Sequence, residues 1–216
     1  MMTPLKAAIF DFGGVFTTSP VTNFAAYEKE RGLPHRFISS VIKANINDGA
    51  FAQYERAEID LDAFDRAFAE ETRAAGHEVP GRTLVGLLSL TFRPDMIDAL
   101  ARVKAAGFLT GCITNNMPSH DTQEMLADEK DRKTLGAVFS NFDHIIESSK
   151  AGVRKPEPRI YEMMYDALDV PPEACVFLDD LGVNLKPAKD MGMRTIKVPI
   201  DDVRPAIVEL EGLLGL

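Results

Sequence analysis

Cysteine, histidine and long apolar runs are all scarce in this sequence. The two cysteines, Cys112 and Cys175, fall in predicted strands, which favours buried, reduced thiols and a cytoplasmic location over a disulfide-stabilised secreted protein. The four histidines are scattered without the spacing of a zinc site. No apolar run approaches the roughly 18 residues that a membrane span requires. Residues 1–6 lead directly into a strand, so we expect neither a signal peptide nor a membrane partner.

Positive charge is also in deficit. The chain of 216 residues carries a net charge of −9 and has a pI near 5.0. No basic stripe offsets this acidic excess, which argues against a nucleic acid or an anionic membrane as a partner. An acidic protein that handles a phosphate must therefore concentrate positive charge locally, through a metal ion or a few lysines. The sequence specifies no oligomeric state.

The order of the predicted elements indicates the α/β class. A first strand is expected within residues 5–15, helices over residues 20–90, and alternating strands and helices from residue 93. Four later strands are expected, at residues 108–113, 143–147, 174–178 and 194–198. Connections of about a dozen residues or more between them predict a doubly wound parallel sheet covered by helices on both faces.

The helical stretch interrupts this sheet after its first strand. We therefore expect residues 1–16 and 92–216 to form the α/β core and residues 17–91 to form a helical insert. Within the insert, Asp60 is a predicted N-cap for a helix with an apolar face. Outside it, helices are expected at residues 94–106 (ended by Gly107), 119–133, 160–168 and 184–191, with Pro187 near the start of the last.

Distinct polar residues follow successive predicted strands. Asp11 ends the apolar run at residues 7–10 and leads into a turn with two glycines at positions 13 and 14. Thr114 and Asn115 follow the second strand, Lys155 lies after the third, and Asp179 and Asp180 end the fourth, as the printed sequence shows. Each of these alone is explained by an ordinary turn. Together they predict a site, because doubly wound sheets bind ligands at the carboxyl ends of their strands.

The chemistry of these groups is complementary. Carboxylates at Asp11 and Asp180 suit a hard cation such as Mg²⁺. The Thr114 hydroxyl and nearby backbone N–H groups can hold phosphate oxygens, while Lys155 supplies a point charge. Lys155 also precedes a proline that we expect to start a helix, where a cation opposes the helix dipole, so a nearby anion is expected to relieve the conflict.

These motifs resemble those of the haloacid dehalogenase superfamily. The four signatures match at Asp11 in Asp-Phe-Gly-Gly-Val, at Thr114-Asn115, at Lys155-Pro156 and at Asp179-Asp180. The segments 145–148, 155–161 and 176–188 are most similar to the phosphatase-like N-terminal domains of mammalian soluble epoxide hydrolases. The resemblance implies a Rossmann-like core and a helical cap over the site. It carries over no epoxide hydrolysis, because the α/β-hydrolase domain has no counterpart here.

The resemblance also implies a mechanism for a small organic phosphate. Asp11 would attack phosphorus to form an aspartyl-phosphate that water then cleaves. Mg²⁺ would be held by Asp11, the Gly13 carbonyl and Asp180. Two further residues, Asp179 and Asn184, would orient the ligands of the metal ion. The phosphoryl oxygens would be bound by Thr114, Asn115 and Lys155.

Gly13 departs from this pattern. Phosphatases of the family usually carry there a second aspartate that protonates the leaving group, a function worth roughly 10²–10⁴-fold in rate. The nearest conceivable donors are Thr17, Thr18, His35 and His77, and none is strong. Two alternatives to a phosphatase therefore stay open: a metal-independent hydrolase of the dehalogenase type, and a weak or non-enzymatic binding protein on the same scaffold.

Overall fold

A single parallel sheet organises the chain. The computed structural model describes residues 3–88, 91–118 and 129–216. The sheet has the order β3-β2-β1-β4-β5, with all neighbours parallel. The strands are β1 (Ala7–Phe10), β2 (Leu109–Thr114), β3 (His144–Glu147), β4 (Cys175–Asp179) and β5 (Arg194–Lys197). The expected α/β class with a parallel sheet is confirmed.

The register of the central strand, β1, aligns its carboxyl end with the carboxyl end of β4. Phe10 of β1 pairs with Cys112 of β2 on one side and with Leu178 of β4 on the other. Asp11, the residue after β1, therefore lies beside Asp179, the last residue of β4. All four residues of β1 are buried, as expected of a strand that is covered on both faces.

Helices cover both faces of the sheet, and the alternation within β1 shows this. Ala8 and Phe10 belong to one hydrophobic cluster, Ala7 and Ile9 to another. The first cluster includes side chains from α6 (Pro94–Ala105), α8 (Glu129–Phe139) and α12 (Arg204–Leu214). The second includes side chains from α10 (Pro158–Ala167) and α11 (Gly182–Asp190). Cys112 and Cys175 are buried free thiols, one in each cluster, and burial raises the pKa of both.

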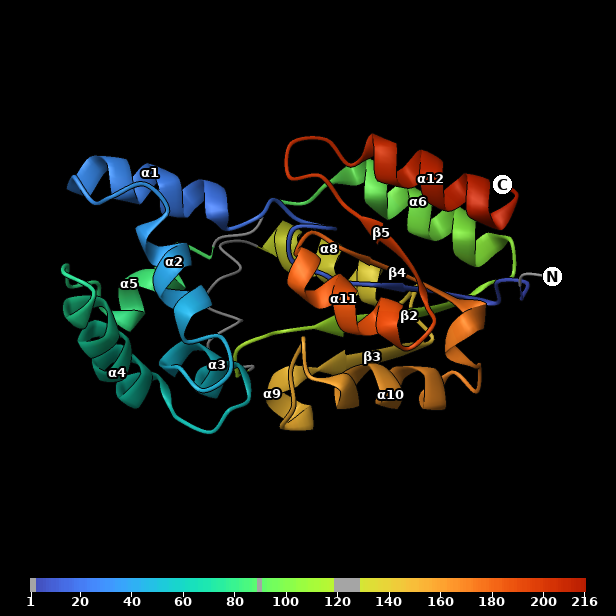
Figure 1. The fold of residues 1–216 in the computed structure, drawn as a ribbon. Coiled ribbons are helices and arrows are strands. Elements are labelled where there is room, and N and C mark those ends of the chain that lie inside the picture. The colour runs from blue at the N-terminus through green and yellow to red at the C-terminus, as the bar shows by residue number, and fades with distance from the viewer. Residues whose placement is uncertain (1–2, 89–90, 119–128) are drawn as a thin grey trace.

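The remaining helices lie together beyond the carboxyl end of the sheet, on the left of Figure 1. They are α1 (Val21–Arg31), α2 (Phe37–Ala44), α3 (Ala50–Glu55), α4 (Leu61–Ala74) and α5 (Gly81–Gly86). Their own core contains Tyr54 stacked on Phe64, with ring centroids 4.5 Å apart. The expected N-cap is confirmed, because the Ala63 N–H donates to Asp60 Oδ1 over 2.8 Å.

The two connections between this helical insert and the sheet run side by side. Thr17 forms an antiparallel bridge with Phe92, and the Thr18 N–H donates to the Thr91 carbonyl over 2.8 Å. The Arg93 N–H donates to the Phe16 carbonyl over the same distance. We propose residues 17–91 as the extent of the inserted unit, since these bonds lie at both of its ends.

Several helices differ from expectation. The helix expected over residues 119–133 falls partly outside the described residues, and α8 continues to Phe139. α12 and the short α9 (Ser148–Ala151) were not expected. Because α11 begins at Gly182, Pro187 lies in its second turn rather than its first. In the described part of the chain, none of the helices combines the length and apolar character that a bilayer span needs.

Candidate active site

Asp11 lies at the carboxyl end of β1, nearly buried. Its backbone N–H donates to the Leu178 carbonyl over 2.8 Å, which continues the sheet by one bond. Its carboxylate Oδ1 accepts from the Phe12 N–H over 2.6 Å and from Lys155 Nζ over 2.6 Å. Burial, together with Asp179 and Asp180, raises the pKa of Asp11, while Lys155 opposes this rise.

Gly14 makes this turn possible. Its φ of +78° lies in the left-handed region, and a Cβ there would lie 2.3 Å from Asp180 Oδ2. A side chain at position 14 is therefore excluded both by the backbone conformation and by the Asp180 carboxylate.

Lys155 is the cation at the centre of the site, and its side chain is 1% exposed. Its Nζ lies 2.6 Å from Asp11 Oδ1 and 2.9 Å from Asp179 Oδ2. Burial disfavours the ammonium, but the Asp11 and Asp179 carboxylates outweigh it and raise the pKa of Lys155 above its usual value. The expected helix start is wrong: α10 begins at Pro158, and Lys155 lies in the preceding loop before a cis peptide bond to Pro156. Carboxylates face Lys155 as expected, but a helix dipole is not the reason.

Asp179 is fully engaged by the protein. Its Oδ1 accepts from the Leu181 N–H over 2.7 Å and from Asn184 Nδ2 over 3.1 Å. Its Oδ2 accepts from Asn184 Nδ2 over 3.0 Å and from Lys155 Nζ over 2.9 Å. Asp179 therefore holds Lys155 in place, and Asn184 holds Asp179.

Asp180 points into the same site. Burial and the neighbouring Asp179 raise its pKa to about 6, against the effects of Lys155 and a hydrogen bond from the Ser19 side chain. Oxygens of Asp11, Asp179 and Asp180 all lie within 4.8 Å of one another. Three carboxylates with one lysine leave an excess of negative charge in a dry site, and this donor set fits a hard divalent cation such as Mg²⁺. Because the protein itself binds Asp179, Asp11 and Asp180 are the carboxylates that would hold the ion.

The end of β2 supplies two neighbours with different tasks. Thr114 is a nearly buried residue at the last position of β2, where it pairs with Glu147, the last residue of β3. The Asn115 amide is already used: the Lys155 N–H donates to its Oδ1 over 2.8 Å, and its Nδ2 donates to the Lys155 carbonyl over 2.9 Å. The side-chain amide of Asn115 therefore fixes the main chain of Lys155, and a contact of Asn115 with phosphate, which its backbone N–H could make, stays a prediction.

The space beside Gly13 is open. A Cβ at Gly13 would meet no atom within 4 Å. The conceivable replacement acids do not gather there. His77 stacks edge-on against Phe37 at 5.3 Å, and the Thr17 hydroxyl is buried without a hydrogen-bond partner among the described residues. His35 is an exposed residue of the insert.

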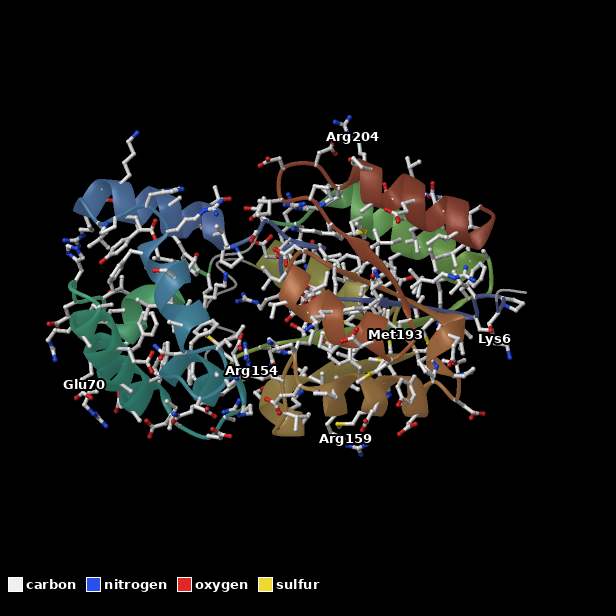
Figure 2. All side chains as sticks on the ribbon, in the orientation of Figure 1. Lys6, Glu70, Arg154, Arg159, Met193 and Arg204 are labelled. Atoms are coloured by element: carbon white, nitrogen blue, oxygen red, sulfur yellow. The ribbon has the colours of Figure 1, made fainter. Side chains whose placement is uncertain are left out.

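Sequence reasoning missed two buried, charged residues at the edge of the site. Glu55 ends α3 of the insert, and Arg154 directly precedes Lys155; they form an ion pair of 2.6 Å. Figure 2 labels Arg154 where the insert meets the core. The two residues are 99 positions apart, so no local pattern indicates that they meet.

Known proteins share this arrangement of motifs. The sequence profile of the haloacid dehalogenase-like hydrolases matches residues 5–192, and the chain belongs to this family of hydrolases. Bifunctional epoxide hydrolase 2 of Rattus norvegicus is 31% identical over 98% of this chain, which spans 39% of that relative. The sesquiterpene phosphatase astK of Aspergillus oryzae is 28% identical, with both chains covered completely.

A solved structure supports the fold. A HAD family enzyme of Bacteroides thetaiotaomicron, in complex with magnesium and inorganic phosphate, aligns with a TM-score of 0.58 at 19% identity. The alignment covers 92% of this chain and 96% of that one. The expected Rossmann-like core of this family is thus confirmed.

Proposed function

We propose that this protein is a Mg²⁺-dependent phosphatase that acts on a small organic phosphate through an aspartyl-phosphate on Asp11. One observation carries the proposal: Asp11, Lys155 and the Asp179-Asp180 pair come from three distant segments and enclose one buried site. Phosphatases among the relatives and a related structure with bound magnesium and phosphate support it. A phosphate ester as the substrate is supported by a nucleophilic carboxylate, the Lys155 ammonium and further carboxylates that could hold a divalent cation.

The residues divide the reaction between them. The Asp11 carboxylate attacks phosphorus, and the ester bond to the leaving group breaks with its electron pair on the departing oxygen. Lys155 and the Thr114 hydroxyl hold the phosphoryl oxygens, together with backbone N–H groups after β2. Water then attacks the acyl phosphate, which releases inorganic phosphate and restores Asp11. Asp11, Asp180 and the Gly13 carbonyl would hold Mg²⁺, which would supply positive charge to offset the negative charge of the transferring group.

The absence of an acid at Gly13 narrows the substrates. Without a proton donor, the leaving oxygen departs as an anion, so esters of acidic alcohols or phenols are favoured. The residues that lead from the turn into the insert, 16–20, are largely apolar or uncharged. They fit the organic part of such an ester.

Hydrolysis of an aryl phosphate tests the proposal directly. We expect phosphate release with Mg²⁺, none after chelation, and none from Asp11→Asn, which keeps the size of the side chain but removes the nucleophile. A variant with wild-type turnover would refute the role of Asp11. Metal binding without any turnover would favour a non-enzymatic protein.

A dehalogenase is the second candidate, and Gly13 favours it because carbon attack by Asp11 needs no acid at that position. The Asp179-Asp180 pair argues against it, since carboxylates gathered beside the nucleophile are the ligands that a divalent cation prefers. Halide release from a 2-haloacid in the presence of a chelator would decide for this alternative. For either reaction, we expect a cytoplasmic protein, because Cys112 and Cys175 are buried thiols.

A further inference from the structure

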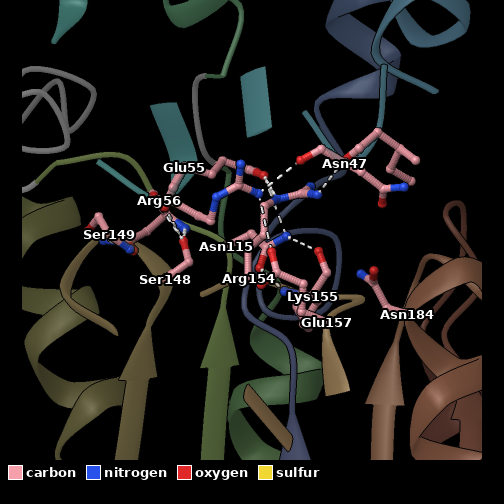
Figure 3. Close-up of polar contacts among 12 residues, drawn as sticks. Asn47, Glu55, Arg56, Asn115, Ser148, Ser149, Arg154, Lys155, Glu157 and Asn184 are labelled. Atoms are coloured by element: carbon pink, nitrogen blue, oxygen red, sulfur yellow. Dashed lines mark hydrogen bonds and ion pairs between the residues drawn. The ribbon is translucent and has the colours of Figure 1, made fainter. Parts of the chain in front are cut away.

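A polar network joins the helical insert to the loop that carries Lys155, as Figure 3 shows. Arg154 Nε lies 2.6 Å from Glu55 Oε2, and each of these side chains is only 8% exposed. Arg154 Nη1 also donates to the Ile46 carbonyl of the insert over 2.7 Å. A second residue of the core, Ser148, donates its hydroxyl to the Glu55 carbonyl over 2.7 Å. Core and insert are thus bonded to each other at one buried point.

The same network reaches the main chain of Lys155. Arg154 is its direct neighbour, and the Asn115 amide bonds both its N–H and its carbonyl. Asn115 Nδ2 in turn lies 3.5 Å from Glu55 Oε2. Glu55 therefore contacts both groups that flank Lys155, while the Lys155 ammonium contacts the nucleophile Asp11.

The stability of the insert does not account for this arrangement. Glu55 and Arg154 are charged and add no apolar packing to the hydrophobic core of the insert, which is built around residues such as Tyr54 and Phe64. A buried ion pair contributes little net stability compared with apolar residues of the same size, because both charges lose their hydration. Such pairs are better suited to fixing one geometry, since either charge is costly when its partner moves away.

We propose that Glu55 and Arg154 are positioning residues that hold Lys155 against Asp11 only when the insert is docked on the core. The inference rests on the proposed phosphatase function. The insert then contributes to phosphoryl binding without touching the phosphate: its docking completes the main-chain geometry of the loop at residues 154–156. A substrate that favours the docked insert thereby favours the reactive position of Lys155.

Steady-state hydrolysis of an aryl phosphate with Mg²⁺ tests this in four variants. We expect Glu55→Gln and Arg154→Met each to lower kcat by about 10²-fold, the effect of a displacement of about 1 Å at a reacting group. The double variant should be no worse than the poorer single one, because both act through one contact. Glu78→Gln is the matched control, since the Glu78 ion pair with Arg73 is an exposed contact of the same insert. It should keep the wild-type kcat and KM.

Hydrogen exchange separates this inference from the proposed function. The Lys155 amide donates to Asn115, so its exchange should accelerate in Glu55→Gln and stay unchanged in Glu78→Gln. A wild-type protein without turnover would refute the phosphatase, yet this exchange would still test the role of Glu55. Wild-type kcat in both single variants, additive losses in the double variant, or unchanged exchange would overturn the inference. Should Glu55→Gln fail to fold, the double variant decides, because no buried charge in it lacks its partner; wild-type kcat there would refute the proposal.

Discussion

An aspartate at position 13 should give this protein the proton donor that its sequence lacks. A Cβ at Gly13 meets no atom within 4 Å, and the residue has no positive φ that would demand glycine. The new carboxyl would lie two residues from Asp11, in a chain segment that leads out of a site with two further carboxylates, and nearby negative charge raises the pKa of a carboxyl. A raised pKa favours the protonated form that a general acid requires.

The expected gain depends on the leaving group. A positioned acid is worth roughly 10²–10⁴-fold in rate, which corresponds to about 3–5 kcal/mol of transition-state free energy. Phosphate esters of simple alcohols should approach this gain in kcat/KM, because an alkoxide leaves poorly without a proton. Nitrophenyl phosphate should gain little, since its leaving group is stable as an anion.

The assay is therefore a series of phosphate esters graded by leaving-group acidity, measured for the wild type and for Gly13→Asp with Mg²⁺. The slope of log kcat/KM against leaving-group pKa should become shallower in the variant. Gly13→Asn is the control, because it has the same size and cannot act as an acid. An equal gain in Gly13→Asn, or a gain that is uniform across the series, would refute the reasoning.

Four further predictions follow from the same site. Gly14→Ala should weaken Mg²⁺ binding and lower the melting temperature, since its Cβ would overlap Asp180 and a left-handed backbone costs about 1–2 kcal/mol; unchanged calorimetric affinity would contradict this. Lys155→Met should abolish turnover and cost about 3–5 kcal/mol in denaturant titrations, because it leaves buried carboxylates without their cation. Mg²⁺ at 100 times its Kd should stabilise the protein by about 2.7 kcal/mol, and Asp180→Asn should reduce that shift. Burial raises the pKa of Glu55 despite Arg154. The contribution of Glu55 to the free energy of unfolding is therefore complete below its pKa in the unfolded chain and is lost as pH rises through its pKa in the folded protein. Between these two pKa values, the wild type should lose stability relative to Glu55→Gln as pH rises.

The strand ends were predictable because each is a short apolar run that stops at a polar residue. Asp11 and Asp179 follow uninterrupted apolar segments, and the parallel register then places them side by side. The glycine turn was predictable too, because it directly follows the apolar run that ends at Asp11. At position 14 only glycine fits, whereas at position 13 the sequence has lost a side chain that the structure still has room for.

Interactions between distant segments explain what the sequence did not reveal. The family resemblance implied phosphate binding by Asn115, but it did not indicate that the side-chain amide of Asn115 accepts from the main chain of a residue 40 positions away. Glu55 and Arg154 each look like ordinary surface charges, and only the docking of α3 on the core buries them. Pro156 was expected to start a helix, but it is Pro158 that begins α10, and a proline in the sequence does not indicate which of two neighbouring prolines takes that position.

The bridge between Thr17 and Phe92 has a consequence for how such a protein can change. A segment that leaves and rejoins its host at neighbouring, hydrogen-bonded positions imposes almost no spacing on the sheet, so its length and content are free to vary. Under the proposed function, recombination at these two connections should exchange the selectivity for the organic group and leave the reaction at phosphorus intact. Any transplanted module would, however, need a carboxylate to meet Arg154, or the new enzyme would recognise its substrate and transform it slowly.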